Sequence, residues 1–130
     1  MTPPPIALSL IVCEKAIVEE RTRNLTLVST FTKMLVDRFP SLPQQLVVYS
    51  VLTDGVGDAT IDLVVTRLDT GEDVYLLRAQ SHFPDRLTEV PVLYRVNGCS
   101  FPAPGKYQLT LLVDGEWVAQ RQMTIMERKV

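Results

Sequence analysis

The residues with the greatest potential for chemistry lie around the single histidine of the chain. His82 stands in the segment Ser81-His82-Phe83-Pro84-Asp85, where Asp85 is close enough in sequence to suggest a His–Asp pair. Nucleophilic catalysis also needs a group that the histidine can activate, and Cys99 or Ser100 supplies one if the fold brings that loop alongside. The alternative is a hydrogen-bonded loop histidine beside a strand end. A lone histidine is far more often of that second kind, so the sequence favours it.

A second group of polar residues lies in the segment Asp54-Gly55-Val56-Gly57-Asp58. The two carboxylates and the loop carbonyls are suitable calcium ligands, but two carboxylates are too few to define a site. An ordinary polar hairpin loop is the favoured interpretation. The two glycines are followed by neither the lysine nor the helix that a phosphate-binding loop needs. We therefore expect no catalytic, cofactor-binding or metal-binding residues and no cofactor.

Length and charge narrow the class of protein further. The 130 residues suffice for one domain, expected over residues 1–130, and the content of 46% hydrophobic and 22% charged residues is that of a globular chain. Thirteen Lys and Arg residues stand against fifteen Asp and Glu residues, a net charge of −2. Residues 1–65 carry 5 basic and 7 acidic side chains, and residues 66–130 carry 8 of each. Without a basic region, a nucleic-acid partner is not expected.

An apolar run at residues 6–13 ends in Cys13 and invites comparison with a secretion signal or a lipoprotein anchor. No Lys or Arg precedes the run, Val12 before the cysteine is not small, and Glu14-Lys15 follow at once. The run is also far shorter than the ~20 apolar residues that cross a bilayer. We expect a buried strand in a cytoplasmic protein without membrane contact. Cys13 is then a small buried hydrophobe and Cys99 a free loop thiol, with no disulfide between them.

Alternation of apolar and polar residues dominates the rest of the chain. Segments with the character of strands occur at residues 6–12, 25–31, 46–52, 61–66, 74–77, 90–96, 107–113 and 117–125. Those at residues 25–31, 61–66, 90–96 and 107–113 alternate with period two, which is typical of half-buried strands. No helical period persists over three turns, and the prolines near residues 39–45 indicate an irregular crossover. About eight strands without helical crossovers predict an all-β fold, a two-sheet antiparallel sandwich of immunoglobulin-like type. A closed barrel remains the alternative.

Turn residues and side-chain parity give more local predictions. Asp114-Gly115 predicts a two-residue hairpin. Tyr107, just after Pro104-Gly105, is placed where sandwiches carry a tyrosine corner, although an ordinary cross-strand aromatic is equally compatible. In the last strand Arg121 interrupts the apolar row, which indicates a bulge or a sheet edge. The predicted core consists of Leu8, Leu10, Leu27, Val48, Ile61, Leu63, Val65, Tyr94, Tyr107, Leu109, Leu111 and Ile125.

Two of the segments, residues 6–12 and 46–52, are apolar on both faces. Such a strand is either central and covered on both sides, or one of its sides faces a partner. Because residues 6–12 contain no charge, an uncovered edge there would be an aggregation hazard. This feature predicts that the protein pairs with another chain, either as a homodimer or as a subunit of a larger assembly.

The order of short motifs resembles an uncharacterised family of small bacterial β-sandwich proteins. The resemblance rests on Cys13-Glu14-Lys15, Leu25-Thr26-Leu27, Phe39-Pro40 with Pro43, Leu52-Thr53-Asp54-Gly55, Pro104-Gly105-Lys106-Tyr107 and Asp114-Gly115. It spans most of the chain, although each motif alone is common among sandwich modules. What it implies is a fold and a bacterial, cytosolic origin, with no activity, cofactor or site residues.

Two functional classes follow. The first is a non-catalytic protein-interaction or assembly module of unknown partner. The alternative is a small-ligand or metal-dependent enzyme that uses loop residues around His82, Asp85 and Cys99. The two classes differ in one observable, whether those three side chains come within hydrogen-bonding reach of one another in a cleft.

Overall fold

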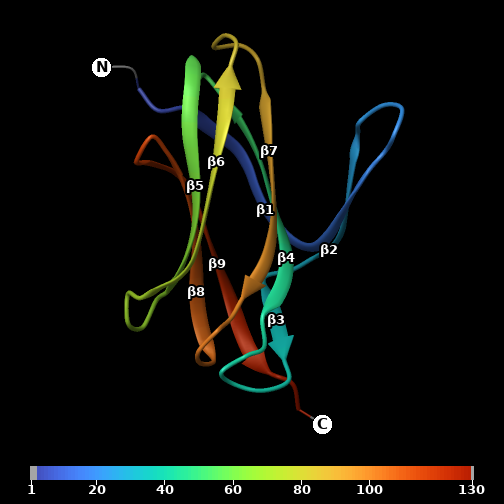
Figure 1. Ribbon diagram of the computed structural model, residues 1–130, viewed down its shortest axis with the longest axis vertical. Coiled ribbons are helices and arrows are strands. Elements are labelled where there is room, and N and C mark those ends of the chain that lie inside the picture. Colours follow the sequence, from blue (N-terminus) through green and yellow to red (C-terminus); the bar gives the residue numbers. More distant parts are fainter. Residues whose placement is uncertain (1–2, 130) are drawn as a thin grey trace.

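The computed structural model describes residues 3–129, which form nine strands and no helix. The strands are β1 (Ile6–Val18), β2 (Leu25–Thr30), β3 (Lys33–Val36), β4 (Gln44–Thr53), β5 (Gly57–Arg67), β6 (Asp73–Phe83), β7 (Val90–Cys99), β8 (Gly105–Val113) and β9 (Glu116–Glu127) (Figure 1).

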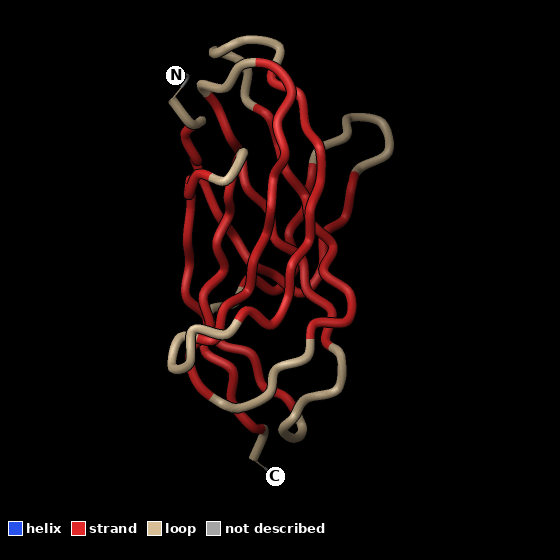
Figure 2. Tube along the Cα trace, turned by 60° about the vertical axis from the view of Figure 1, so that its left-hand side comes forward, coloured by secondary structure: helices blue, strands red, loops and turns tan. Residues whose placement is uncertain are grey.

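These strands form two sheets that lie against each other (Figure 2). Sheet A has the strand order β2-β1-β4-β7, and sheet B has the order β3-β9-β8-β5-β6. All pairings are antiparallel except that of β3 with β9. The expected all-β, two-sheet sandwich is confirmed.

The four-residue strand β3 is absent from the sequence-based set of about eight strands, and it pairs with β9 in parallel. A parallel pair needs a long connection, and the sequence shows no helical crossover that would indicate one. Here the connection runs through the whole of the sandwich between β3 and β9. A segment of four residues is also too short to display a period.

The core lies between the sheets and contains most of the predicted residues. Nine of the twelve are buried: Val48, Ile61, Leu63, Val65, Tyr94, Tyr107, Leu109, Leu111 and Ile125. The Tyr94 hydroxyl, on sheet A, donates a hydrogen bond to the Ile61 carbonyl of sheet B over 2.7 Å. That bond satisfies a hydroxyl which would otherwise be buried without a partner.

Three predicted core residues are not fully buried in the main core. Leu8 is 55% exposed, because the pairing of β1 with β4 shifts register between Ala7 and Ser9, and the extra residue turns outward. Leu10 is only half-buried at the rim of the core. Leu27 packs in a separate small cluster outside the main core.

Both turn predictions are confirmed. Asp114 and Gly115 have φ angles of 49° and 84°, as the two central residues of a hairpin turn between β8 and β9 require. The Tyr107 ring is fully buried, and its hydroxyl donates to the carbonyl of Ala103 over 2.6 Å. This is the tyrosine corner.

One part of sheet A extends beyond the sandwich. Strand β1 pairs with β4 from Ile6 to Cys13 and with β2 from Cys13 to Val18. The remainder of this hairpin, residues 14–30, is called the β1–β2 arm below. It stands apart from the two layers in both Figure 1 and Figure 2.

Candidate functional site

His82 lies near the end of β6 and is paired with a different carboxylate from the predicted one. Its Nδ1 is 2.7 Å from Oδ1 of Asp58, the residue opposite on β5. Both side chains are exposed, at 64% and 89%. The pair continues a ladder of polar cross-strand contacts between the two strands, in which Gln80 meets Thr60 and Arg78 meets Asp62.

Asp85 is engaged elsewhere. Its Oδ1 accepts hydrogen bonds from the backbone N–H groups of Leu87 and Thr88 and from the Thr88 hydroxyl. These hydrogen bonds stabilise the ionised carboxylate and therefore lower the pKa of Asp85. The bond from the Thr88 hydroxyl is the largest cause. This is the geometry of a side chain that stabilises its own turn.

Cys99 lies at the opposite end of the molecule. Cys99 is the last residue of β7 and pairs with Gln44. The first residue of β7, Val90, pairs with Leu52 and lies at the end of the sandwich where His82 is found. The nine residue steps between Val90 and Cys99 correspond to ~30 Å of strand. Cys99 is a free thiol, as expected, but it ends β7 instead of lying in a loop. It is fully buried, and the burial raises its pKa to about 11.

The predicted cluster of His82, Asp85 and Cys99 therefore does not form. The second group is dispersed as well: Asp54 accepts from Arg86 Nη1 over 3.4 Å, and Asp58 pairs with His82. Within residues 3–129 no group of three or more His, Cys, Asp or Glu side chains is placed to hold a metal ion. Both cysteines, which lie in this described part, are free thiols.

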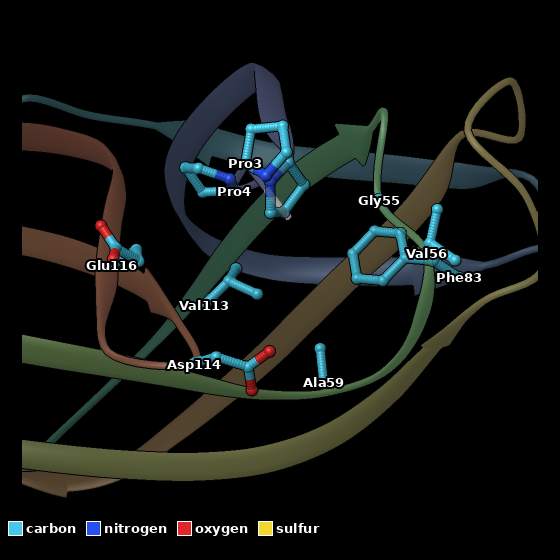
Figure 3. Close-up of a pocket in the computed structure, with 10 residues that line it drawn as sticks. Pro3, Pro4, Gly55, Val56, Ala59, Phe83, Val113, Asp114 and Glu116 are labelled. Carbon is cyan, nitrogen blue, oxygen red and sulfur yellow. The ribbon is translucent and has the colours of Figure 1, made fainter. Parts of the chain in front are cut away.

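A cavity of about 200 Å³ lies at the end of the sandwich where the chain begins (Figure 3). Pro3 and Pro4 form one wall, and the Phe83 ring and Val113 lie opposite. A Cβ atom on Gly55 would come within 2.7 Å of the Phe83 ring, so glycine is required there. The carboxylate of Asp114, which also lines the cavity, accepts a bond from the Thr60 backbone N–H. The cavity thus combines apolar walls with two carboxylates, that of Glu116 and that of Asp114, which is already hydrogen-bonded.

The outer face of sheet A is the most unusual surface of the molecule. The rows of β1, β4 and β7 that point away from the core meet in register, Ile11 beside Tyr49 and Tyr49 beside Leu93. With the rows on either side, this outer face of sheet A consists of Ser9, Val51 and Pro91, then Ile11, Tyr49 and Leu93, then Cys13, Val47 and Arg95. In this set Ser9 and Arg95 are the hydrophilic residues, and the other seven side chains are mainly apolar.

The outer face of sheet B has the opposite character. Its matching rows on β5, β8 and β9 are Asp62, Leu112 and Trp117, then Val64, Thr110 and Gln120, then Thr66, Gln108 and Gln122. Six of these nine positions carry a carboxylate, a hydroxyl or an amide. In an antiparallel sheet with one face in water, apolar and polar residues normally alternate along each strand. Sheet B follows that rule more closely than sheet A, although Trp117 in its first row is 64% exposed.

The sequence profile of a family of unknown function, DUF6941, matches residues 8–126 of this chain. The chain belongs to DUF6941. No curated protein shows a significant sequence match to it. A solved structure, the Pseudomonas fluorescens alkylpurine DNA glycosylase AlkC bound to DNA containing an abasic site analog, is similar over 90% of this chain and 30% of that one. The identity is 9% and the TM-score 0.42, a likeness too distant to bear on function. Residues 3–129 contain no helix with the length and apolarity of a membrane span.

The sheet edges of this DUF6941 member are modified in ways that oppose strand addition. Arg121 of β9 donates from Nη1 to the Leu10 carbonyl of β1 over 2.9 Å, so a charged group occupies the gap between two open edges. Register shifts on β1, between Ala7 and Ser9, and on β9, opposite Leu111 and Leu112, interrupt both edges. Pro91 lies on the edge strand β7. Inward charges, bulges and proline are the usual means of protecting an edge.

Arg121 was expected to coincide with a bulge or an edge, and the structure places both nearby. The bulge falls between Trp117 and Ala119, and β9 is an edge strand where β3 does not reach. Trp117 shares the sequence parity of the inward residues Met123 and Ile125, but the bulge moves it to the outer row, where it is 64% exposed. The outer face of sheet A was signalled by the apolar character of residues 6–12 and 46–52, but the sequence did not show that these two strands are neighbours.

Proposed function

We propose that this DUF6941 member is a non-catalytic protein-interaction or assembly module that binds a protein partner through the outer face of sheet A. The observation that carries the proposal is the outward row of β4. Val47, Tyr49 and Val51 all point away from the main core. Val47 is buried in a small separate cluster, and Tyr49 and Val51 are half-buried, with no third sheet over them in residues 3–129.

A partly exposed apolar sheet face is costly in water. Each Å² of apolar surface removed from water contributes about 25 cal/mol, so a partner that covers such rows gains several kcal/mol. Contiguous apolar patches on soluble proteins mark interaction sites more often than isolated exposed residues do. The polar outer face of sheet B serves as an internal comparison, since the same chain places Thr, Gln and Asp where the surface faces water.

The face is better suited to this role than the edges. Strand addition requires a row of available N–H and C=O groups. The Arg121 bond to Leu10, the register shifts and Pro91 all work against such a row. This departs from the expectation that the edge at residues 6–12 is the pairing element.

The enzymatic alternative has lost the arrangement on which it depended, because His82, Asp85 and Cys99 are separated and individually engaged or buried. The immunoglobulin-like type of the sandwich, its bacterial origin and its cytoplasmic location remain parts of this proposal. So does the absence of nucleic-acid and membrane partners, which the balanced charge supports.

Site-specific photo-crosslinking in the native host tests the proposal. A photoreactive phenylalanine analogue replaces Tyr49 in one variant and Gln120, on the outer face of sheet B, in the matched control. We expect discrete crosslinked protein products from position 49 and none from position 120. Equal products from both positions, or none from position 49, would refute an interface on the outer face of sheet A.

A further inference from the structure

The end of the sandwich where the chain begins is strongly acidic. The connections β4–β5, β6–β7 and β8–β9 lie at this end (Figure 1). Residues 54–58, 84–89 and 114–116, which include these connections, each contribute two carboxylates, and Arg86 is the one Lys or Arg residue among them. The balanced charge of the whole chain therefore conceals a local excess of negative charge, which attracts cations.

The cavity at this end has rigid apolar walls. Phe83, Ala59 and Val113 are each at most 5% exposed and belong to the main core. The Phe83 ring packs so closely on Gly55 that no side chain fits between them. Ligand sites of proteins are usually formed before the ligand arrives and are lined mainly by apolar groups. These walls have both properties.

The charged groups of the cavity lie at its mouth. Asp114 and Glu116 are both exposed, whereas the apolar walls are buried. The Asp114 carboxylate points toward Ala59 (Figure 3), and it is held there because Oδ1 accepts the Thr60 N–H over 2.9 Å. Neither carboxylate forms an ion pair with a residue in the range 3–129, and none of the ten residues lining the cavity is basic. Both negative charges are thus available to a ligand.

We propose that this cavity binds a small organic ammonium ion. The apolar chain of the ligand enters between Phe83 and Val113, and its ammonium group lies at the mouth beside Asp114 and Glu116. The volume of about 200 Å³ has room for roughly seven non-hydrogen atoms, at ~30 Å³ for each water-sized unit. A lysine or arginine side chain of a partner would enter with its charged end first, so its charge would meet the apolar walls and not the carboxylates.

This site is independent of the proposed function. No residue that lines the cavity belongs to the outer face of sheet A or to the β1–β2 arm. A ligand bound in the cavity leaves that face accessible to a protein partner. Failure of the ligand test consequently leaves the interaction module untouched, and the reverse also holds.

A series of ligands of similar size separates the contribution of the apolar chain from that of the charge. Hexylammonium, hexanol and hexanoate are titrated at pH 7 and low salt into the isotope-labelled protein, and backbone amide NMR shifts are followed at Gly55, Val56, Ala59 and Val113. For hexylammonium we expect saturable shifts with a dissociation constant on the order of 1 mM, ordinary for a ligand of this size. Hexanol should bind more weakly, and hexanoate and the short methylammonium ion should produce no saturable shifts.

A charge-neutralising variant tests the role of the two carboxylates. Asp114→Asn retains an oxygen that can accept the Thr60 N–H, and Asn-Gly suits the same hairpin turn. Combined with Glu116→Gln, it should weaken hexylammonium binding roughly 5-fold, as expected for two exposed ionic contacts. Hexanol binding should stay unchanged, which also shows that the cavity remains folded. Glu72→Gln with Glu127→Gln removes the same charge at the opposite end and should have no effect.

Three results would each overturn the proposal. The first is the absence of saturable shifts at the cavity with hexylammonium. The second is equal binding of hexylammonium and hexanoate, since an apolar cavity without a role for charge accepts both. The third is hexylammonium binding that is unaffected in the Asp114→Asn, Glu116→Gln variant.

Discussion

The hydroxyl of Tyr107 donates a hydrogen bond to the carbonyl of Ala103, four residues earlier in the chain, over 2.6 Å. The Tyr107 ring is fully buried and meets the Phe101 ring edge to face, with centroids 5.0 Å apart. Ala103 lies in the connection from β7 in sheet A to β8 in sheet B, so the bond ties the end of that loop to β8.

Tyr107→Phe should lower the free energy of unfolding by ~1–3 kcal/mol, because it leaves the Ala103 carbonyl and N–H without their partner at little change in volume. Urea unfolding measures the loss. Tyr75→Phe, at a half-buried position on β6, serves as the control. A variant as stable as the wild type would show that the corner contributes nothing.

The two leucines Leu109 and Leu8 should respond differently to the same truncation. Leu109 is fully buried, so Leu109→Ala should cost ~2–5 kcal/mol through lost transfer energy and a residual cavity. Leu8 is 55% exposed at the register shift of β1, so Leu8→Ala should cost under ~1 kcal/mol. Denaturant midpoints of the two variants decide the matter, and similar losses would mean that β1 has been placed in the wrong register.

Burial of Cys99 predicts a pH dependence at alkaline pH. Its folded pKa, about 11, exceeds the reference value of 9.0, so the neutral thiol stabilises the fold below pH 9. That contribution is lost as the pH rises from about 9 to about 11. The urea midpoint of the wild type should therefore fall more steeply in this window than that of Cys99→Ala. Parallel pH profiles for the two proteins would argue against a buried, protonated thiol.

The contact between Arg78 and Asp62 predicts the opposite dependence. The guanidinium, bonded to the carboxylate over 2.7 Å, lowers the pKa of Asp62, so the stabilisation is present at neutral pH and is lost as the pH falls through the folded pKa. Arg78→Gln should be slightly less stable than the wild type at pH 7, with the difference vanishing in acid. Unfolding curves at pH 7 and below pH 3 test this, and a difference that persists in acid contradicts it.

The sequence predicted what depends on local patterns and missed what depends on distant neighbours. Alternation in strands such as residues 107–113 placed Tyr107, Leu109 and Leu111 in the core, and Asp114-Gly115 fixed a turn, because period and turn chemistry act within a few residues. The outward turn of Leu8 follows from a register shift against β4, and the parallel pairing of β3 with β9 follows from a contact across most of the chain.

The candidate sites show the same division. His82 and Asp85 are three positions apart, yet His82 pairs with Asp58, 24 residues away, because β5 and β6 are antiparallel neighbours. Proximity in sequence was misleading there. Residues 6–12 and 46–52 did signal their apolar outer rows, but the pairing of Ile11 with Tyr49 and of Tyr49 with Leu93 is a property of the folded sheet.

The central claim, that a protein partner binds the outer face of sheet A, is tested most directly by affinity purification of the tagged chain from its native host. Tyr49→Lys places a charge in the middle row of that face, and Gln120→Lys adds the same charge to the outer face of sheet B. We predict that a protein recovered with the wild type and with Gln120→Lys is lost with Tyr49→Lys. Equal recovery with all three chains would contradict the account.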